Sequence, residues 1–109
     1  MERVQTYSPQ TRDAAQLLGL EIARARRARR WSLNELAERA GVSHITVRSA
    51  EKGALTVSIG TVFELAAILG IDLFAPPDQM EGLLSRSRDR LALLPSRVRE
   101  TAVAVDDDF

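Results

Sequence analysis

Two short amphipathic segments separated by a single glycine constrain the fold of this chain more than any other feature. Ser32 can cap the first segment, and Glu35, three residues later, completes a capping box. Gly41 ends that segment because glycine adopts a positive φ without strain. Two residues later, Ser43 can cap a second segment. The sequence therefore predicts two short helices joined by a tight turn.

The small and apolar residues of the two segments have the spacing of a helix-turn-helix. Ala37 allows two steeply crossed helices to approach each other, and Gly41 permits the turn between them. Val47 anchors the second helix, predicted over 44–52, so that its opposite face projects outward. The seven positions that fit the spacing are Leu36, Ala37, Ala40, Gly41, Val42, Val47 and Ala50.

Three further helices are expected, one before this pair and two after it. Leu18, Ile22 and Ala25 recur at helical spacing in the first, which Ser8-Pro9 can open. The next is expected over 59–69, with Ser58 as its cap and Gly70 as its end. The last opens with a box formed by Asp78 and Glu81 and continues until Pro95. The residues along one stripe of this helix are Met80, Leu84, Ser87, Leu91 and Leu94.

The charge is sorted along the chain, although the formal net charge is zero. Residues 1–54 hold ten Lys and Arg against six Asp and Glu, whereas residues 55–109 hold five against nine. A basic first half suits a polyanion, and an acidic second half would repel it. We therefore expect the tail to have a different partner. The arginines between Arg24 and Arg30 form a solvated face, from which one side chain can reach a phosphate.

A DNA-binding role assigns distinct contacts to the outward face of the second short helix. Arg48 can donate two hydrogen bonds to guanine, and Ile45 can contact a thymine methyl group. His44 can donate to base acceptors, although a lone exposed histidine is an equally good interpretation. The predicted base-contacting residues are His44, Ile45, Thr46, Arg48 and Ser49. The predicted phosphate-contacting residues are Ser43, Lys52 and Asn34.

The segment from LGLEIARARRARRWS to LAAILGI, about residues 17–75, resembles the five-helix DNA-binding domain of phage-repressor-like (Xre) regulators, the lambda-repressor-like fold. The resemblance implies an all-α fold, a recognition helix in the major groove and a homodimer on a palindromic operator in double-stranded DNA. It also implies a structural ion pair between Arg26 and Glu51. Two positions depart from the family pattern: Leu33 replaces a phosphate-binding glutamine, and Ala54-Leu55 replace a basic loop.

The C-terminal extension is similar to that of HipB-like antitoxins, which bind HipA-like kinases. The segment TVSIGTVFELAAILGIDLFAPPD and the ending VDDDF carry this resemblance. It implies a short strand, with Val103 and Val105, that pairs with its two-fold mate, and an aromatic anchor, Phe109, that docks on the toxin. The resulting division is an N-terminal arm (1–10), a DNA-binding domain (11–75), a helix for core and dimer contacts (76–94) and a tail (95–109).

Several other functions remain open, but catalysis is not expected. The chain has no cysteine and one histidine, and it lacks a glycine-rich phosphate loop, so we expect no enzyme, metal or cofactor. No window suggests a membrane span or an export signal, and the absence of cysteine fits the cytoplasm. The alternatives are a restriction-modification controller, a lysogeny-type repressor and a protein-interaction adaptor that does not bind DNA.

Overall fold

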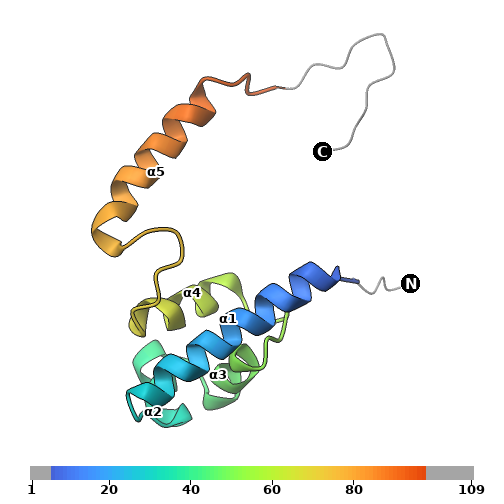
Figure 1. Cartoon of the computed structure of the whole chain (residues 1–109), viewed down its shortest axis with the longest axis vertical. Coiled ribbons are helices and arrows are strands. Elements are labelled where there is room, and N and C mark those ends of the chain that lie inside the picture. Colours follow the sequence, from blue (N-terminus) through green and yellow to red (C-terminus); the bar gives the residue numbers. More distant parts are fainter. Residues whose placement is uncertain (1–5, 98–109) are drawn as a thin grey trace. The chain divides into compact units, whose positions relative to one another are not determined.

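The computed structural model describes residues 6–97, which form five helices and, within that range, no strand (Figure 1). This agrees with the expected all-α, lambda-repressor-like fold. The chain divides into two units, and the boundary between them in the sequence lies between Leu73 and Phe74. The helices are α1 (Pro9–Ala28), α2 (Leu33–Ala40), α3 (His44–Glu51), α4 (Ile59–Ile68) and α5 (Pro77–Ala92).

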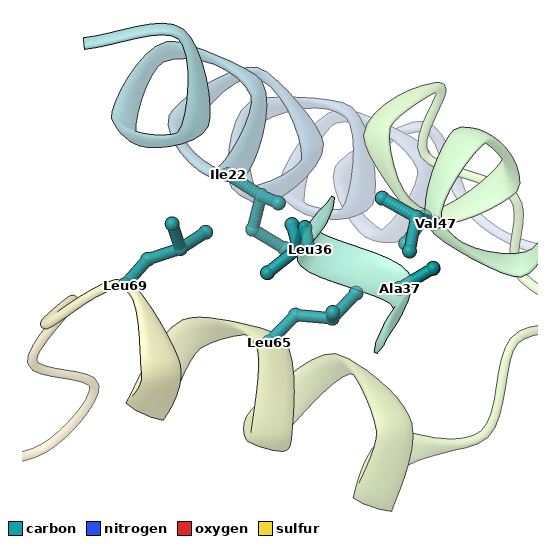
Figure 2. Close-up of a cluster of buried hydrophobic side chains, with 7 residues drawn as sticks. Ile22, Leu36, Ala37, Val47, Leu65 and Leu69 are labelled. Atoms are coloured by element: carbon teal, nitrogen blue, oxygen red, sulfur yellow. The ribbon is translucent and has the colours of Figure 1, made fainter. Parts of the chain in front are cut away.

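The core of the first unit joins all four of its helices. Helix α3 packs against α1 and α2, and α2 also packs against α4. Figure 2 shows side chains from these helices converging on one another. Four of them are fully buried: Ile22, Leu36, Val47 and Leu65. Burial of apolar surface contributes about 25 cal/mol per Å² removed from water, so this cluster stabilises the unit.

The helices of the first unit begin at serines because a serine hydroxyl satisfies a backbone N–H that lacks a helical partner. In each helix the hydroxyl accepts a hydrogen bond from the residue three positions later, at 3.0–3.3 Å. The caps are Ser8, Ser32, Ser43 and Ser58, and the donors are Thr11, Glu35, Thr46 and Thr61.

The cap of α2 is the predicted capping box. The backbone N–H of Ser32 donates to Glu35 Oε1 at 2.7 Å, which completes the reciprocal pair of hydrogen bonds. This hydrogen bond favours the carboxylate and holds the pKa of Glu35 below its ordinary value. The helix ends at Gly41, whose φ of 71° is left-handed, as the sequence predicts.

Close approach of α1 to the end of α3 depends on Gly19. A Cβ at this position would lie 2.5 Å from the carbonyl oxygen of Glu51 and 2.6 Å from that of Ala50. Real Cβ atoms essentially never approach that closely, and backbone atoms cannot rotate away. Glycine at this position therefore allows the backbone of α1 to pack closely against the end of α3.

Several expected helix boundaries differ from the structure. Helix α1 begins at Pro9, so the expected arm over 1–10 is too long by two residues. Helices α3 and α4 each end one residue before the expected position. Helix α5 begins at Pro77 and has no side-chain cap, so the box predicted for Asp78 is wrong. Proline fixes φ near the helical value and needs no partner for its nitrogen, which explains this start.

The core and dimer contacts expected of residues 76–94, which include α5, stay a prediction. No residue of α5 is buried, and the core cluster consists of residues from the first unit. Helix α5 also ends at Ala92, before the expected limit at Leu94. The expected strand at Val103 and Val105 and the anchor Phe109 lie outside the described residues. None of the helices described is long and apolar enough to cross a membrane.

Candidate nucleic-acid interface

Burial fixes the orientation of α3. Val47 is fully buried and Ala50 is 5% exposed, so this side of the helix faces the core. On the other side, Ile45 is 62% exposed and Arg48 is exposed as well. Both side chains are therefore available for contact with a ligand.

The remaining predicted base-contacting residues differ in accessibility. His44 is exposed at the first position of α3, whereas Thr46 and Ser49 are half-buried. The hydroxyl of Thr46 lies 3.0 Å from that of Ser43, and the two share a hydrogen bond. Thr46 therefore contributes to the cap of α3, in addition to any contact with a ligand.

The predicted phosphate-contacting residues lie at helix ends. Lys52 is exposed at the C-terminal cap of α3, and Asn34 is exposed in the first turn of α2. The hydroxyl of Ser43 already accepts the backbone N–H of Thr46 at 3.1 Å. Because the first N–H groups of a helix lack partners within it, the start of α3 can bind an anion through its backbone.

A shallow hollow adjoins the exposed face of α3. One side is lined by Ile45, Thr46 and Ser49, and the other by the segment that leads into α4. The sequence-based prediction missed this second side, whose positions carry hydroxyl or β-branched side chains without a recognisable spacing. Its residues are Thr56, Val57, Ser58 and Thr61.

Arg26 and Glu51 form an ion pair that connects α1 to the end of α3. Arg26 Nε lies 2.6 Å from Glu51 Oε2, and Arg26 Nη2 lies 3.1 Å from Glu51 Oε1. The third nitrogen, Nη1, donates to the carbonyl oxygen of Trp31 at 2.7 Å. The hydrogen bond to Glu51 raises the pKa of Arg26, although burial opposes this shift. The two charges satisfy each other and fix α1, α3 and the turn before α2 in one arrangement.

The Trp31 carbonyl is placed by an unusual end of α1. Arg30 has a φ of 60°, a left-handed conformation that glycine usually occupies. The turn is closed by hydrogen bonds from Arg30 N to Arg27 O at 2.9 Å and from Trp31 N to Arg26 O at 3.1 Å. The backbone strain at Arg30 thus accompanies the contact between Arg26 and Trp31.

The arginines between Arg24 and Arg30 are exposed, as expected of a solvated face, with the exception of the buried Arg26. Arg24 pairs with Glu21 at 2.7 Å on the surface, where such a pair contributes little to stability. Arg39 lies 4.0 Å above the Trp31 ring and Arg29 lies 5.5 Å from it, both within cation–π range. These arginines therefore cover Trp31 in addition to supplying positive charge.

The two departures from the expected family pattern have local explanations. Leu33 is half-buried and packs against the core, so it closes the start of α2 where a polar residue would face outward. Ala54 and Leu55 are half-buried in the segment after α3 and carry no charge. Among residues 6–97, no group of three His, Cys, Asp or Glu side chains can hold a metal ion.

The geometry agrees with a comparison to known families. Residues 22–74, just under half of the chain, match the family model described as Helix-turn-helix. This segment is therefore similar to known helix-turn-helix domains. No curated protein and no solved structure matches the chain. The helix-turn-helix domain supports the function of a DNA-binding transcription regulator, and it makes α3 the candidate recognition helix.

Proposed function

We propose that the chain is a transcriptional repressor that binds a palindromic operator as a homodimer, with α3 of each copy in a major groove. The observation that carries this proposal is the orientation of α3. Val47 faces the core, so Ile45 and Arg48 are presented on the surface. A helix held with this face outward can enter a major groove, which is wide enough to admit an α-helix.

The exposed side chains provide the chemistry for base recognition. Arg48 can donate two hydrogen bonds to the O6 and N7 atoms of guanine, and His44 can donate to the same acceptors. Ser49 can hydrogen-bond several base edges. The exposed methyl groups of Ile45, beside the hollow toward α4, favour a thymine methyl group at the adjacent base pair.

Phosphate contacts would hold α3 in its groove. Lys52 supplies a cation at the end of α3, and the backbone N–H groups after Ser43 supply an anion site at its start. Asn34 extends the contact to the first turn of α2. The segment at Ala54-Leu55 adds no charge, so we expect a modest salt dependence for each copy, which dimerisation offsets.

Two-fold symmetry of the protein would be mirrored in the operator. In a helix-turn-helix dimer the two recognition helices enter successive major grooves about 34 Å apart. Binding would then cover about two turns of DNA, and repression would follow from occlusion of the promoter.

Selection of binding sites from a random duplex pool tests the proposal. We expect enrichment of one sequence with two-fold symmetry and half-sites about one helical turn apart. Retention of all duplexes alike would contradict specific recognition, and retention of none at low salt would support the adaptor alternative. Lys52→Ala is the matched variant, because loss of one phosphate contact should weaken every duplex and lower the salt slope by about one.

We propose an antitoxin role as a narrower second function. It is supported by the acidic second half of the chain and by the ending VDDDF, which resembles HipB-like antitoxins. The partner would be a HipA-like kinase bound through Phe109. Co-purification from the native cell tests this role: the full chain should retain a kinase and the chain lacking residues 98–109 should not. Equal recovery with both chains would contradict binding through the tail.

A further inference from the structure

Helix α5 carries an exposed apolar stripe. Met80, Leu84 and Leu91 are 40%, 51% and 70% exposed, and no residue of the helix is buried. Met80 and Leu84 also line a hollow with Leu83, Phe74 and the polar Glu81 and Ser87. An isolated helix of this length is only marginally stable in water, and most helices in proteins are stabilised by packing of their apolar face. We therefore expect another apolar surface to cover the stripe.

Charged residues border the stripe on one edge in a definite order. With about 100° of rotation per residue, Glu81 and Arg88 lie about 60° and 40° from Leu84 on the same side. They are seven residues apart, which is about 10.5 Å along the helix. This edge is therefore acidic near the start of α5 and basic near its end. The opposite edge carries Leu83 and Arg90, at about 100° and 120°.

We propose that the stripe of α5 is covered by α5 of a second copy that runs antiparallel to it. A two-fold axis near the middle of α5 would place Glu81 opposite the second copy's Arg88, and Arg88 opposite the second copy's Glu81. The same axis would place Met80 against the second copy's Leu91. The small Ser87 would leave room for the second copy's Leu84. Charge and apolar packing therefore agree on one register.

A parallel arrangement lacks this complementarity. In a parallel pair, the edge with Glu81 and Arg88 would face the opposite edge of the second copy. That edge offers Leu83 and Arg90 but no acidic residue. In that pair Glu81 would face the second copy's Pro76, which is five positions earlier in the sequence and has no charge. The order of charges on one edge therefore favours the antiparallel orientation.

Charge reversal in the full chain, without DNA, tests the inference. Glu81→Arg and Arg88→Glu each replace two attractive contacts of the dimer with two repulsive ones. We expect each variant to raise the dimer dissociation constant about tenfold, as measured by sedimentation equilibrium. The double variant Glu81→Arg/Arg88→Glu should restore the original value. An equimolar mixture of the two single variants should also restore association, because the mixed dimer has opposite charges at both contacts.

Two further variants complete the test. Asp89→Arg changes the charge by the same amount as Glu81→Arg, but it lies about 140° from Leu84, outside the proposed contact, and should have no effect. Leu84→Glu should abolish association. Helix content measured by circular dichroism, in samples diluted until every variant is monomeric, confirms that the single reversals leave the fold intact.

The inference rests on the proposed homodimer, and the outcomes separate the two. A chain that remains monomeric at every concentration contradicts both the homodimer and this inference. A chain that dimerises with equal affinity in all charge variants contradicts only the α5 contact. Loss of the dimer on removal of residues 98–109, together with no effect of Leu84→Glu, would place the interface in the tail instead and overturn the inference.

Discussion

The two units of the chain use the same apolar residues in opposite ways. In the first unit, apolar side chains from four helices cover one another, and Leu36 and Leu65 are fully buried. In the second, Leu84 and Leu91 of α5 are more than half exposed. Helical spacing of apolar residues thus indicates that a helix has a face to bury, but not which surface covers it.

The comparison also separates the two proposed functions. Core contacts of the first unit determine which side of α3 reaches the surface, so its packing serves the proposed DNA recognition. The second unit carries the exposed stripe for which we propose association with a second copy. Substitutions in the first unit should therefore change stability, and substitutions in α5 should change association.

The most severe test of this contrast is truncation of one leucine in each unit. Leu36→Ala creates a cavity between α2 and its neighbours, and we expect a loss of about 2–5 kcal/mol in the free energy of unfolding. Leu84→Ala should change it by less than about 0.5 kcal/mol when the chain is monomeric. Urea denaturation at low protein concentration measures both, and equal losses would show that α5 belongs to the core.

Removal of one partner from the ion pair should have the next largest effect. Arg26→Ala leaves the carboxylate of Glu51 without its main partner, and we expect the free energy of unfolding to fall by about 3 kcal/mol. This is the lower end of the range for buried pairs, because each side chain is about a tenth exposed. The double variant Arg26→Met/Glu51→Leu should recover much of this loss, as chemical denaturation can show. A double variant less stable than Arg26→Ala would contradict the desolvation argument.

A methyl group at Gly19 should separate α1 from α3. We expect Gly19→Ala to lower the free energy of unfolding by about 1–3 kcal/mol, the usual cost of overpacking, because the new Cβ meets two backbone oxygens at the end of α3. Gly60→Ala is the matched control in α4, where no atom lies within 4 Å of the added Cβ. The control should gain up to about 1 kcal/mol from helix propensity. Thermal unfolding of both variants would reveal the opposite signs.

The smallest expected effect concerns the capping box of α2. The folded-state pKa of Glu35 is lowered, chiefly by the Ser32 N–H, so the carboxylate stabilises the fold above its unfolded-state pKa. This contribution is lost as the pH falls through the lowered folded-state pKa. Glu35→Gln retains the acceptor but not the charge, so its deficit relative to the original chain should shrink toward acidic pH. A deficit independent of pH would show that the charge has no role.

Much of the fold could be predicted from local chemistry. Serine caps and left-handed glycines act within a few residues, so Ser32, Gly41 and Ser43 define α2 and α3 without knowledge of the rest of the chain. The buried side of α3 follows as well, because Val47 and Ala50 repeat with helical spacing. The start of α5 was harder to predict, because Pro76-Pro77 begins the helix through backbone geometry and not through the side chain of Asp78.

Features that depend on contacts between distant residues were harder to predict. Gly19 interrupts an apolar stretch, Leu18 to Leu20, and an isolated glycine within a helical pattern was the available signal for its close approach to α3. The left-handed Arg30 gave no signal, because non-glycine residues rarely adopt this conformation. The residues of α4 beside the recognition helix, such as Thr61, become neighbours of Ile45 only in the folded chain.

The central claim is that the outward face of α3 contacts base edges, and the affinity of Arg48→Ala for two duplexes tests it most directly. One duplex is the sequence selected by the original chain, and the other is the same composition in scrambled order. We expect Arg48→Ala to reduce the binding free energy for the selected duplex by about 1–3 kcal/mol and to remove the preference for one base pair. Its affinity for the scrambled duplex should change little. Equal losses on both would contradict base recognition by α3 and assign Arg48 to the phosphate backbone.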